Sequence, residues 1–318
     1  MSAVAANDAA IVALGSGAGA QWSSTNGTEW ATSSGFGAAD SPQLAVARPT
    51  GFVAVGTSGG FPVAWASSNG RAWHRHVPPL DWKAQSGGVF GLAVGRGVIV
   101  AIGWSEAGVC TEGGSATNPC RSRSEAWWSS DGASWHLAEG LGMLPGGVEG
   151  LTATDEGFVA SGFASVGRSA FRHSADGRRW SRVAGATLRG AVLDLTYFEG
   201  RYVATLNSRS GANTVIETSN LTAWTTITST PFRDIAISLA LVTSFVPVAG
   251  GVDAVVCSET ACDILQSSDR HAWSVLSLDP LIRMLNLLGL TEFHGRLEVA
   301  ANDSSGTGGV LSLESSAP

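Results

Sequence analysis

The stretch Ser129-Ser130-Asp131-Gly132-Ala133-Ser134-Trp135 decides the fold of this chain, because its pattern, Ser/Thr-x-Asp/Asn-Gly-x-x-Trp, recurs along all 318 residues. Six copies can be read, the last two without the glycine: Ser24 to Trp30, Ser67 to Trp73, Ser129 to Trp135, Ser174 to Trp180, Thr218 to Trp224 and Ser267 to Trp273. Successive tryptophans are 43, 62, 45, 44 and 49 residues apart. This period suits one four-stranded antiparallel blade per repeat, with an insertion in one blade.

The residue types in the pattern explain its structural role. An Asp or Asn side chain can accept hydrogen bonds from backbone N–H groups of its own tight turn, and Gly supplies a positive φ. The Trp four residues later is expected to start the next strand and to lie in the apolar layer between neighbouring blades. The structural positions are therefore Asn26, Asn69, Asp131, Asp176, Asn220 and Asp269, with Trp30, Trp73, Trp135, Trp180, Trp224 and Trp273.

This pattern resembles the Asp-box, or bacterial neuraminidase repeat, of the sialidases, sortilin-type receptors, xyloglucan-cleaving glycosidases and a photosystem II assembly factor. The resemblance covers essentially the whole chain. It implies a β-propeller in which the motif forms the turn between the third and fourth strands, C and D, away from the active-site face. It therefore implies a fold and leaves the activity open.

The second strand of each unit, strand B, recurs seven times, beginning near Ile11, Phe52, Val98, Phe158, Tyr202, Asp253 and Leu297. We therefore predict an all-β, seven-bladed propeller forming a single domain over residues 1–318. The expected blades span about 2–34, 41–78, 87–139, 147–184, 188–229, 234–279 and 284–318. The sequence ends where a seventh repeat turn would begin, so the last blade is predicted to have three strands.

Composition narrows the classes of partner. The net charge is −7 and Lys83 is the only lysine, so no basic stripe is available to hold a phosphate backbone, and we expect no nucleic-acid partner. No apolar run reaches the roughly 18 to 20 residues needed to span a bilayer. No phosphate-cradling glycine loop and no metal-ligand spacing stands out, so we expect neither a cofactor nor a metal. The sequence leaves the oligomeric state open.

The four cysteines form two local pairs, Cys110 with Cys120 and Cys257 with Cys262, each within one predicted loop. This arrangement suggests two short disulfides, although four reduced thiols are the alternative. Disulfides persist in oxidising compartments, so we expect an exported or cell-surface protein whose signal or anchor segment precedes Met1 and has been removed.

Chemistry is expected on the rim that carries the D-to-A and B-to-C connections, because these line the mouth of the central channel. The carboxylates that could act there are Asp40, Asp81, Glu149 and Asp234. The residues that could bind a ligand are Trp82, Lys83, Trp104, Glu106, Arg189 and Arg233. Trp82 and Trp104 are not explained by the repeat, and an aromatic ring flanked by carboxylates is a common way to hold a sugar. A loop tryptophan can equally pack beneath its own loop.

The sialidases to which the repeat is similar use three arginines, a Tyr–Glu nucleophile pair and an Asp acid/base. The match is poor, because the tyrosines, Tyr197 and Tyr202, fall in strands, and Arg48 and Arg96 belong to A-to-B turns on the opposite rim. We expect no sialidase activity. A glycosidase needs two carboxyl groups roughly 5 to 10 Å apart, and the sequence dictates no such pair.

The sequence therefore predicts a non-catalytic binding or scaffolding propeller that recognises a carbohydrate or a protein on the D-to-A and B-to-C face. The alternative is a glycoside hydrolase that uses carboxylates at the channel mouth. Convergence of two of these carboxyls in one pocket, with a raised pKa for one of them, would favour the enzyme.

Overall fold

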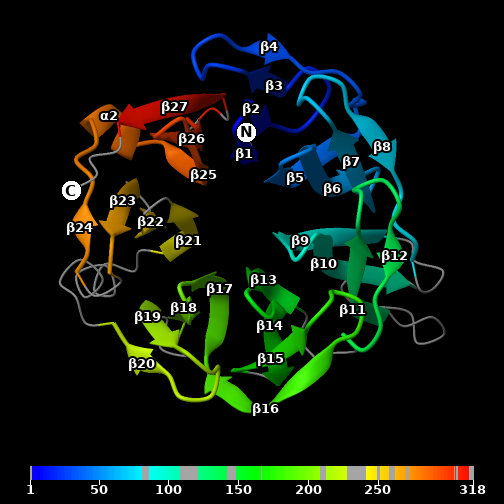
Figure 1. Ribbon diagram of the computed structural model, residues 1–318, viewed down its shortest axis with the longest axis vertical. Coiled ribbons are helices and arrows are strands. Elements are labelled where there is room, and N and C mark those ends of the chain that lie inside the picture. Colours follow the sequence, from blue (N-terminus) through cyan, green and yellow to red (C-terminus); the bar gives the residue numbers. More distant parts are fainter. Residues whose placement is uncertain are drawn as a thin grey trace.

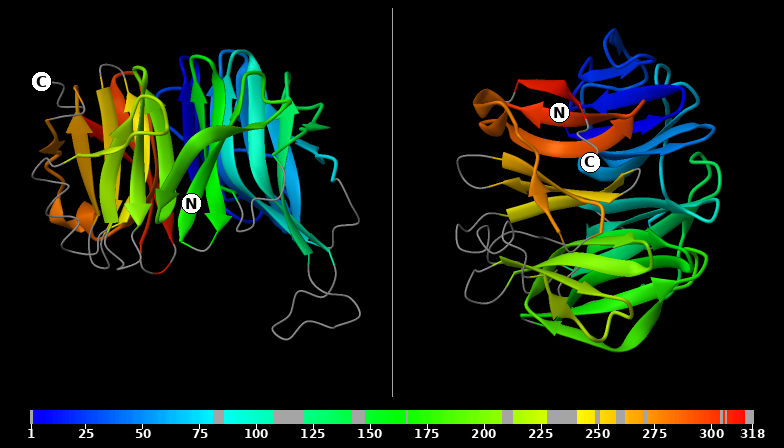
Figure 2. Two further views of the ribbon diagram at one scale, coloured as in Figure 1. Left: turned by 90° about the horizontal axis from the view of Figure 1, so that it is seen from below. Right: turned by 60° about the vertical axis from the view of Figure 1, so that its left-hand side comes forward.

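The computed structural model describes residues 2–80, 86–107, 121–141, 148–165, 167–207, 213–227, 241–248, 251–257, 262–269, 272–303, 305 and 307–314. Seven antiparallel sheets stand around a central axis, and each runs from an innermost strand A to the outer edge of the ring (Figure 1). In the side view the strands run between two rims (Figure 2). The predicted seven-bladed propeller is therefore confirmed, including the three-stranded last blade.

The first four blades have four strands each, which follow one another from the centre of the ring outward. They are β1 (Ala3–Asn7), β2 (Ala10–Leu14), β3 (Gln21–Ser24) and β4 (Ala31–Thr32); β5 (Asp40–Arg48), β6 (Gly51–Ser58), β7 (Phe61–Ser67) and β8 (His74–His76); β9 (Ser86–Gly95), β10 (Val98–Ala107), β11 (Arg121–Ser129) and β12 (His136–Leu137); and β13 (Val148–Thr154), β14 (Gly157–Ser165), β15 (Arg168–Ser174) and β16 (Ser181–Arg189).

The last three blades follow the same order, and a short helix precedes blade 7. They are β17 (Ala191–Phe198), β18 (Arg201–Asn207), β19 (Asn213–Thr218) and β20 (Thr225–Thr226); β21 (Leu241–Val248), β22 (Gly251–Cys257), β23 (Cys262–Ser267) and β24 (Ser274–Val275); then α2 (Pro280–Arg283), β25 (Asn286–Phe293), β26 (Arg296–Asn302) and β27 (Gly308–Glu314).

The six repeat turns are pinned as their residue types predict. In the third, Asp131 Oδ1 accepts the N–H groups of Ala133 and Ser134 at 2.8 and 2.7 Å, and Ser129 Oγ accepts the Gly132 N–H at 2.8 Å. Gly132 has a φ of 86°, a region that glycine adopts readily. Where the fifth turn lacks glycine, Leu221 takes a φ of 64° and buries its side chain.

The repeat tryptophans have a second role that the sequence did not suggest. Their rings lie between blades, and the indole N–H also donates to the carbonyl of the turn glycine, as from Trp135 Nε1 to Gly132 O at 2.9 Å. Leu221 replaces the glycine as acceptor for Trp224 at 3.0 Å. In the first five repeats, each ring thus stabilises its own turn. Strand D begins one residue after the Trp rather than at it.

Each seam between blades is filled from both sides. A valine at the second core position of strand B points toward the repeat turn of the next blade, and a Cβ atom on Gly132 would lie only 2.5 Å from Val53 Cγ2. Only a glycine lets the turn approach this closely. The valines at this register are Val12, Val53, Val100, Val159 and Val203.

In blades 6 and 7 the same register holds Asp253 and Glu298. Both residues are buried, with 3% and 1% of their surface exposed. Burial raises the pKa of Asp253 to about 6, and it raises the pKa of Glu298, whose Oε1 accepts a hydrogen bond from Ser312 at 2.7 Å. Blade 7 is therefore flanked by carboxyl groups where the other blades use valine.

Candidate functional site

The described innermost strands of blades 2 to 7 each contain a β-bulge near the rim on which they begin. A bulge leaves one residue unpaired and redirects its side chain. Phe90 and Leu288 are 47% and 43% exposed although they lie on β9 and β25, the innermost strands of their blades (Figure 1). We call the bulged residues with described side chains the channel collar; they are Gln43, Phe90, Glu149, Leu193 and Leu288.

The collar continues into an aromatic surface in blade 3. The rings of Phe90 and Trp104 are stacked with centroids 6.4 Å apart and planes 27° apart. Trp104 lies opposite Gly88 on the neighbouring strand, where a Cβ atom would approach the indole Nε1 to 2.7 Å. Gly88 therefore lets the indole lie over the backbone of β9, beside Phe90.

Glu149 gives the collar a titratable group. It is the bulged residue of β13, between Val148 and Gly150, and its side chain reaches solvent. Burial against the surrounding protein nevertheless raises the pKa of its carboxyl group. Exposure of the side chain and a raised pKa are compatible for a group on a channel wall, because water reaches such a group from one side only. Desolvation favours the protonated form of a carboxyl group, which can donate as well as accept a hydrogen bond.

The candidate catalytic carboxylates do not form a pair within the described residues. Asp40 is buried, and its Oδ2 accepts the N–H of Gly37 at 2.8 Å, so it holds the turn that enters blade 2. Glu149 lies on the channel wall of blade 4. Asp81 and Asp234 lie outside the described residues. The convergence that would favour an enzyme is therefore not seen in the described part of the chain.

Three of the predicted ligand-binding residues lie in strands rather than in loops. Trp104 and Glu106 belong to β10, which continues to Ala107, because β9 and β10 stay paired as far as Ser86 and Glu106. The Ser86 hydroxyl donates to Glu106 Oε2 at 3.3 Å. Arg189 is the last residue of β16 and lies opposite Arg168. The prediction of loop positions was therefore wrong for these three residues.

The other three predicted ligand-binding residues, Trp82, Lys83 and Arg233, lie outside the described residues. Of the predicted disulfides, Cys257–Cys262 is present, with an S–S distance of 2.04 Å, and it joins the ends of β22 and β23. Cys110 and Cys120 also lie outside the described residues. The bond is on the rim where B-to-C connections lie.

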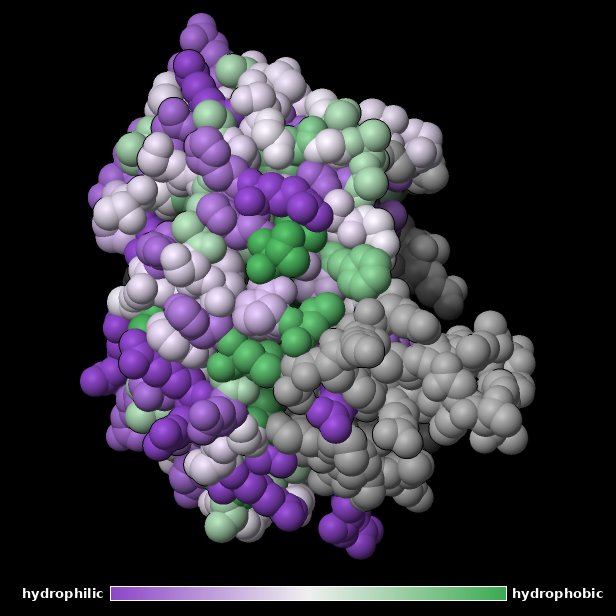
Figure 3. All heavy atoms as spheres, turned by 90° about the vertical axis from the view of Figure 1, so that its right-hand side faces the viewer, coloured by the Kyte–Doolittle hydropathy of each residue, from purple (hydrophilic) through white to green (hydrophobic). Residues whose placement is uncertain are grey.

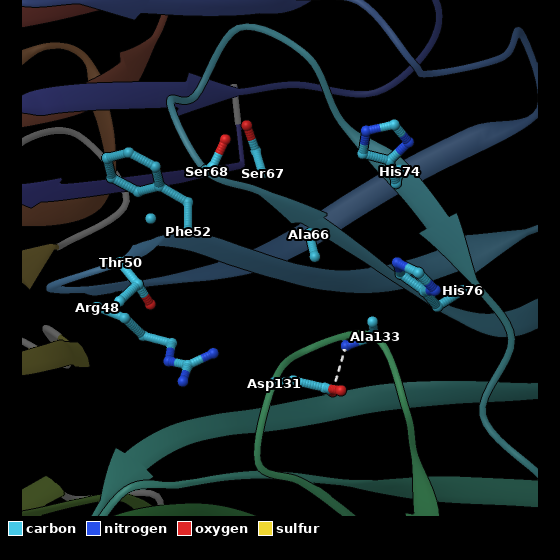
Figure 4. A pocket seen from close by; sticks show the side chains of 11 residues that line it. Arg48, Thr50, Phe52, Ala66, Ser67, Ser68, His74, His76, Asp131 and Ala133 are labelled. Atoms are coloured by element: carbon cyan, nitrogen blue, oxygen red, sulfur yellow. Dashed lines mark hydrogen bonds between the residues drawn. The ribbon is translucent and has the colours of Figure 1, made fainter.

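A concave site lies on the opposite rim, between blades 2 and 3. This cleft has a volume of about 340 Å³ and is lined by Arg48, Thr50, His74, His76 and Asp131, among others (Figure 4). Burial lowers the pKa of His76, and Asp131 only partly offsets this shift. Arg48 already donates to Ser130 O at 2.9 Å, and Asp131 is engaged by its own turn. The polar groups of this cleft are thus mostly committed to structure.

The outer surface beside this cleft is mainly polar, with a few apolar groups near the middle of the view (Figure 3). Trp128, which the repeat does not explain, is covered on this side. His136 stacks on it with centroids 4.5 Å apart, and the Arg178 guanidinium lies 4.1 Å from its ring centre. Trp128 therefore serves the junction of blades 3 and 4.

Two features are absent from the described residues. No cluster of three His, Cys, Asp or Glu side chains is arranged to hold a metal ion there. No helix in that part of the chain is long and apolar enough to cross a membrane.

Sequence reasoning missed most of the collar, namely Gln43, Phe90, Leu193 and Leu288. Each occupies the same register in its blade, one residue before the strand A segment that pairs regularly with strand B. Aligning the seven units by strand B would have placed Phe90 and Leu288 together. It would not have shown that the bulge exposes them, because bulges depend on backbone pairing.

No family model and no curated protein sequence matches the chain. Many solved structures do. A structure of YCF48 bound to a D1 peptide superposes with a TM-score of 0.63 at 13% identity, over 99% of this chain and 93% of that one. At such identities the likeness shows the fold alone.

Hydrolases are among the structural neighbours. Puromycin hydrolase superposes with a TM-score of 0.65 at 12% identity over 98% of this chain, and Trypanosoma rangeli sialidase with 0.53 at 13% identity over 84%. This chain spans only 51% and 53% of their lengths. The fold places this protein in the class of β-propellers. The structural neighbours in this class include a peptide-bound protein and hydrolases.

Proposed function

We propose that this protein is a binding propeller that holds a segment of a protein partner against the channel collar. The observation that carries the proposal is the exposure of large apolar side chains, Phe90 and Leu288, on innermost strands. Large exposed apolar side chains are more informative on the wall of a channel than when they are scattered over the outer surface. Trp104 extends the apolar surface outward in blade 3.

A protein segment suits the collar better than a nucleic acid or a sugar chain. The collar offers two leucines and a phenylalanine, with polar contacts from Gln43 and Glu149 and no basic residue. Apolar side chains with a few placed polar groups favour peptide side chains. The neighbouring propeller YCF48 is seen bound to a peptide, which supports a protein partner. Carbohydrate binding through the Phe90 and Trp104 rings is the alternative ligand class.

We propose that the protein has no catalytic activity, because the described candidate carboxylates are separate and Asp40 is engaged by a turn. A glycoside hydrolase remains the competing function. We further propose that the six repeat turns are Asp-boxes, on the basis of their residue types and hydrogen bonds. The Cys257–Cys262 disulfide supports an exported protein.

Binding can be tested with random 15-residue peptide arrays and a glycan array, using the wild type, Phe90→Ala and Leu288→Ala. Val275→Ala is the matched control, because Val275 is 54% exposed but lies on the outer strand β24. We expect peptide binding that weakens about ten-fold or more in the collar variants and is unchanged in the control. Binding of glycans only, or equal binding by all variants, would refute the protein-partner proposal.

The competing enzyme can be tested on the same proteins with a panel of aryl glycosides and polysaccharides. We expect no turnover by the wild type. Turnover that falls by about 100-fold or more in Glu149→Gln would establish a catalytic carboxyl group and overturn the non-catalytic proposal.

A further inference from the structure

Blade 7 leaves its outer strand open within the described residues. β27 pairs with β26 on one side only, whereas the third strand of each other blade also pairs with a strand D. In blade 2, Ala64, Trp65 and Ala66 pair with β8. The matching register in blade 7 is Val310, Leu311 and Ser312. A strand edge of this kind presents backbone N–H and C=O groups that can pair with another extended segment.

A pocket lies beside this edge. Its volume is about 200 Å³, and it is lined by Trp22, Trp30, Gly308, Gly309 and Val310. Trp22 and Trp30 are only partly buried. This differs from their equivalents in blade 2, where 0% of Trp65 and 4% of Trp73 are exposed. The pocket is thus the uncovered form of a site that is filled elsewhere in the same molecule.

The equivalent sites that are filled, in other seams, show which kind of segment fits this pocket. In the seam between blades 1 and 2, the chain leaving β4 places Phe36 5.3 Å from Trp65 and 5.5 Å from Trp73, measured between ring centroids. The backbone pairs as well, since Ser34 O accepts the Trp73 N–H at 3.0 Å. Gly35 has a φ of 102° and packs against the Trp73 backbone, where a Cβ atom would clash.

The seam between blades 3 and 4 repeats this arrangement. Glu139 O accepts the Trp180 N–H at 2.8 Å, Gly140 has a φ of 79°, and Leu141 is buried in the same cluster as Trp180. Two seams thus use an extended pair of residues followed, a few residues later, by glycine and a large apolar residue.

We infer that the open edge of β27 and the Trp22–Trp30 pocket together bind an extended segment of a different protein, which adds a fourth strand to blade 7 and inserts an apolar side chain after a glycine. Main-chain pairing supplies affinity in such strand addition, and the side-chain pocket supplies selectivity. The described segments of this chain with that pattern, 31–36 and 136–141, are already built into blades 1 and 3. A second copy therefore has neither segment to offer.

The natural probe is a labelled synthetic peptide of residues 31–38, which fills the equivalent site in blade 1. Binding to the full chain can be followed by fluorescence polarisation. We expect saturable binding below about 1 mM, and binding about ten-fold weaker when the peptide carries Phe36→Ser. Failure to bind at that concentration overturns the inference.

A substitution at Gly309 can block the Trp22–Trp30 pocket without disturbing the fold. A Cβ atom there meets nothing within 4 Å, so Gly309→Glu should fold normally and place its carboxylate in the pocket. We expect Gly309→Glu to weaken the peptide about ten-fold or more and Gly309→Ala to leave its affinity within about two-fold. Equal affinity of the Glu variant and the wild type would show binding elsewhere and overturn the inference.

Two further measurements distinguish the remaining outcomes: the oligomeric state of the protein and peptide binding by a variant of the channel collar. If light scattering shows a dimer that Gly309→Glu dissociates, the occupant is a second copy and the inference is wrong. The collar variant Phe90→Ala should bind the 31–38 peptide as the wild type does. Loss of binding in Phe90→Ala would assign the peptide to the collar, so failure of this inference is distinguishable from failure of the proposed function.

Discussion

In the seam between blades 2 and 3, Trp127 and Trp135 are buried beneath Leu80, with the Trp127 indole N–H donating to Pro79 O at 2.6 Å. In the seam between blades 7 and 1, the equivalent Trp22 and Trp30 are only partly buried and border a pocket. The two seams share one plan. They differ because, in the described residues, nothing from a strand D of blade 7 covers the second one.

The seams differ in polarity too. Val53 packs on Gly132 in the seam between blades 2 and 3, which we call the closed seam. In the seam between blades 7 and 1, the open seam, Glu298 Oε1 takes the equivalent place, 3.4 Å from where a Cβ atom on Gly27 would lie. One seam is thus close-packed and apolar, and the other contains a buried carboxyl group. The ring is therefore closed by seams of unequal packing, and an added strand would cover the seam that borders a pocket.

The largest expected effect contrasts the two repeat tryptophans. Trp135→Ala should lower the free energy of unfolding by about 3 to 5 kcal/mol, because it leaves a cavity in a closed seam. Trp30→Ala should cost only about 1 to 2 kcal/mol, because the ring already borders a pocket and buries less area. Denaturant unfolding of both variants measures the difference. Equal losses would mean that the two seams are equally packed.

The second prediction concerns Asp253 at the junction of blades 6 and 7. Its pKa is raised to about 6, so the folded state keeps the proton where the unfolded chain has lost it. Stability should therefore be fully present below pH 3.8 and fall as the pH rises to about 6, by about 3 kcal/mol in total. Asp253→Asn should remove this fall relative to the wild type. Thermal unfolding measures the stability of both proteins across this pH range. If the two stabilities change with pH in parallel, the prediction is wrong.

The third prediction concerns Glu298 in the open seam, where ionisation is again expected to lower the stability of the fold. Burial raises the pKa of Glu298, so its ionisation destabilises the fold as the pH rises above the ordinary range of a glutamate. Glu298→Gln should match the wild type at pH 4 and be the more stable protein at pH 8, by less than Asp253→Asn. Val53→Gln in the closed seam is the control, and it should destabilise at both pH values. A Glu298→Gln protein that is less stable at pH 8 would show that the charged form is the favoured one.

The smallest expected effect is on the repeat turns themselves. The N–H groups of Ser134 and Ala133 hold the pKa of Asp131 at about 2, so its contribution is present above pH 3.8 and lost as the pH falls through about 2. Because the side chain lies largely in solvent, Asp131→Asn should cost at most about 1 kcal/mol at pH 7. Asn69 already fills this position in blade 2. A loss above about 3 kcal/mol would show that the charge, rather than the hydrogen bonds, pins the turn.

Most of the fold could be predicted because it is local. The turn around Asp131 closes within seven residues, and the spacing of its copies counts the blades. The positions of Trp104, Glu106 and Arg189 could not be predicted, since strand ends depend on how far neighbouring strands stay paired. The channel collar could not be predicted for the same reason. Phe90 and Leu288 read as ordinary strand residues until the bulge exposes them.

Local pattern was enough to predict the number of blades and the residues of the pinned turns, because each blade carries its own copy of a turn closed by short-range hydrogen bonds. Which faces meet became clear only from the folded ring. It placed Asp253 and Glu298 at the register of the seam valines, gathered the collar at the channel, and left Trp22 and Trp30 beside an open edge. These arrangements join residues up to the full length of the chain apart, and local pattern carries no information on pairs that only ring closure brings together.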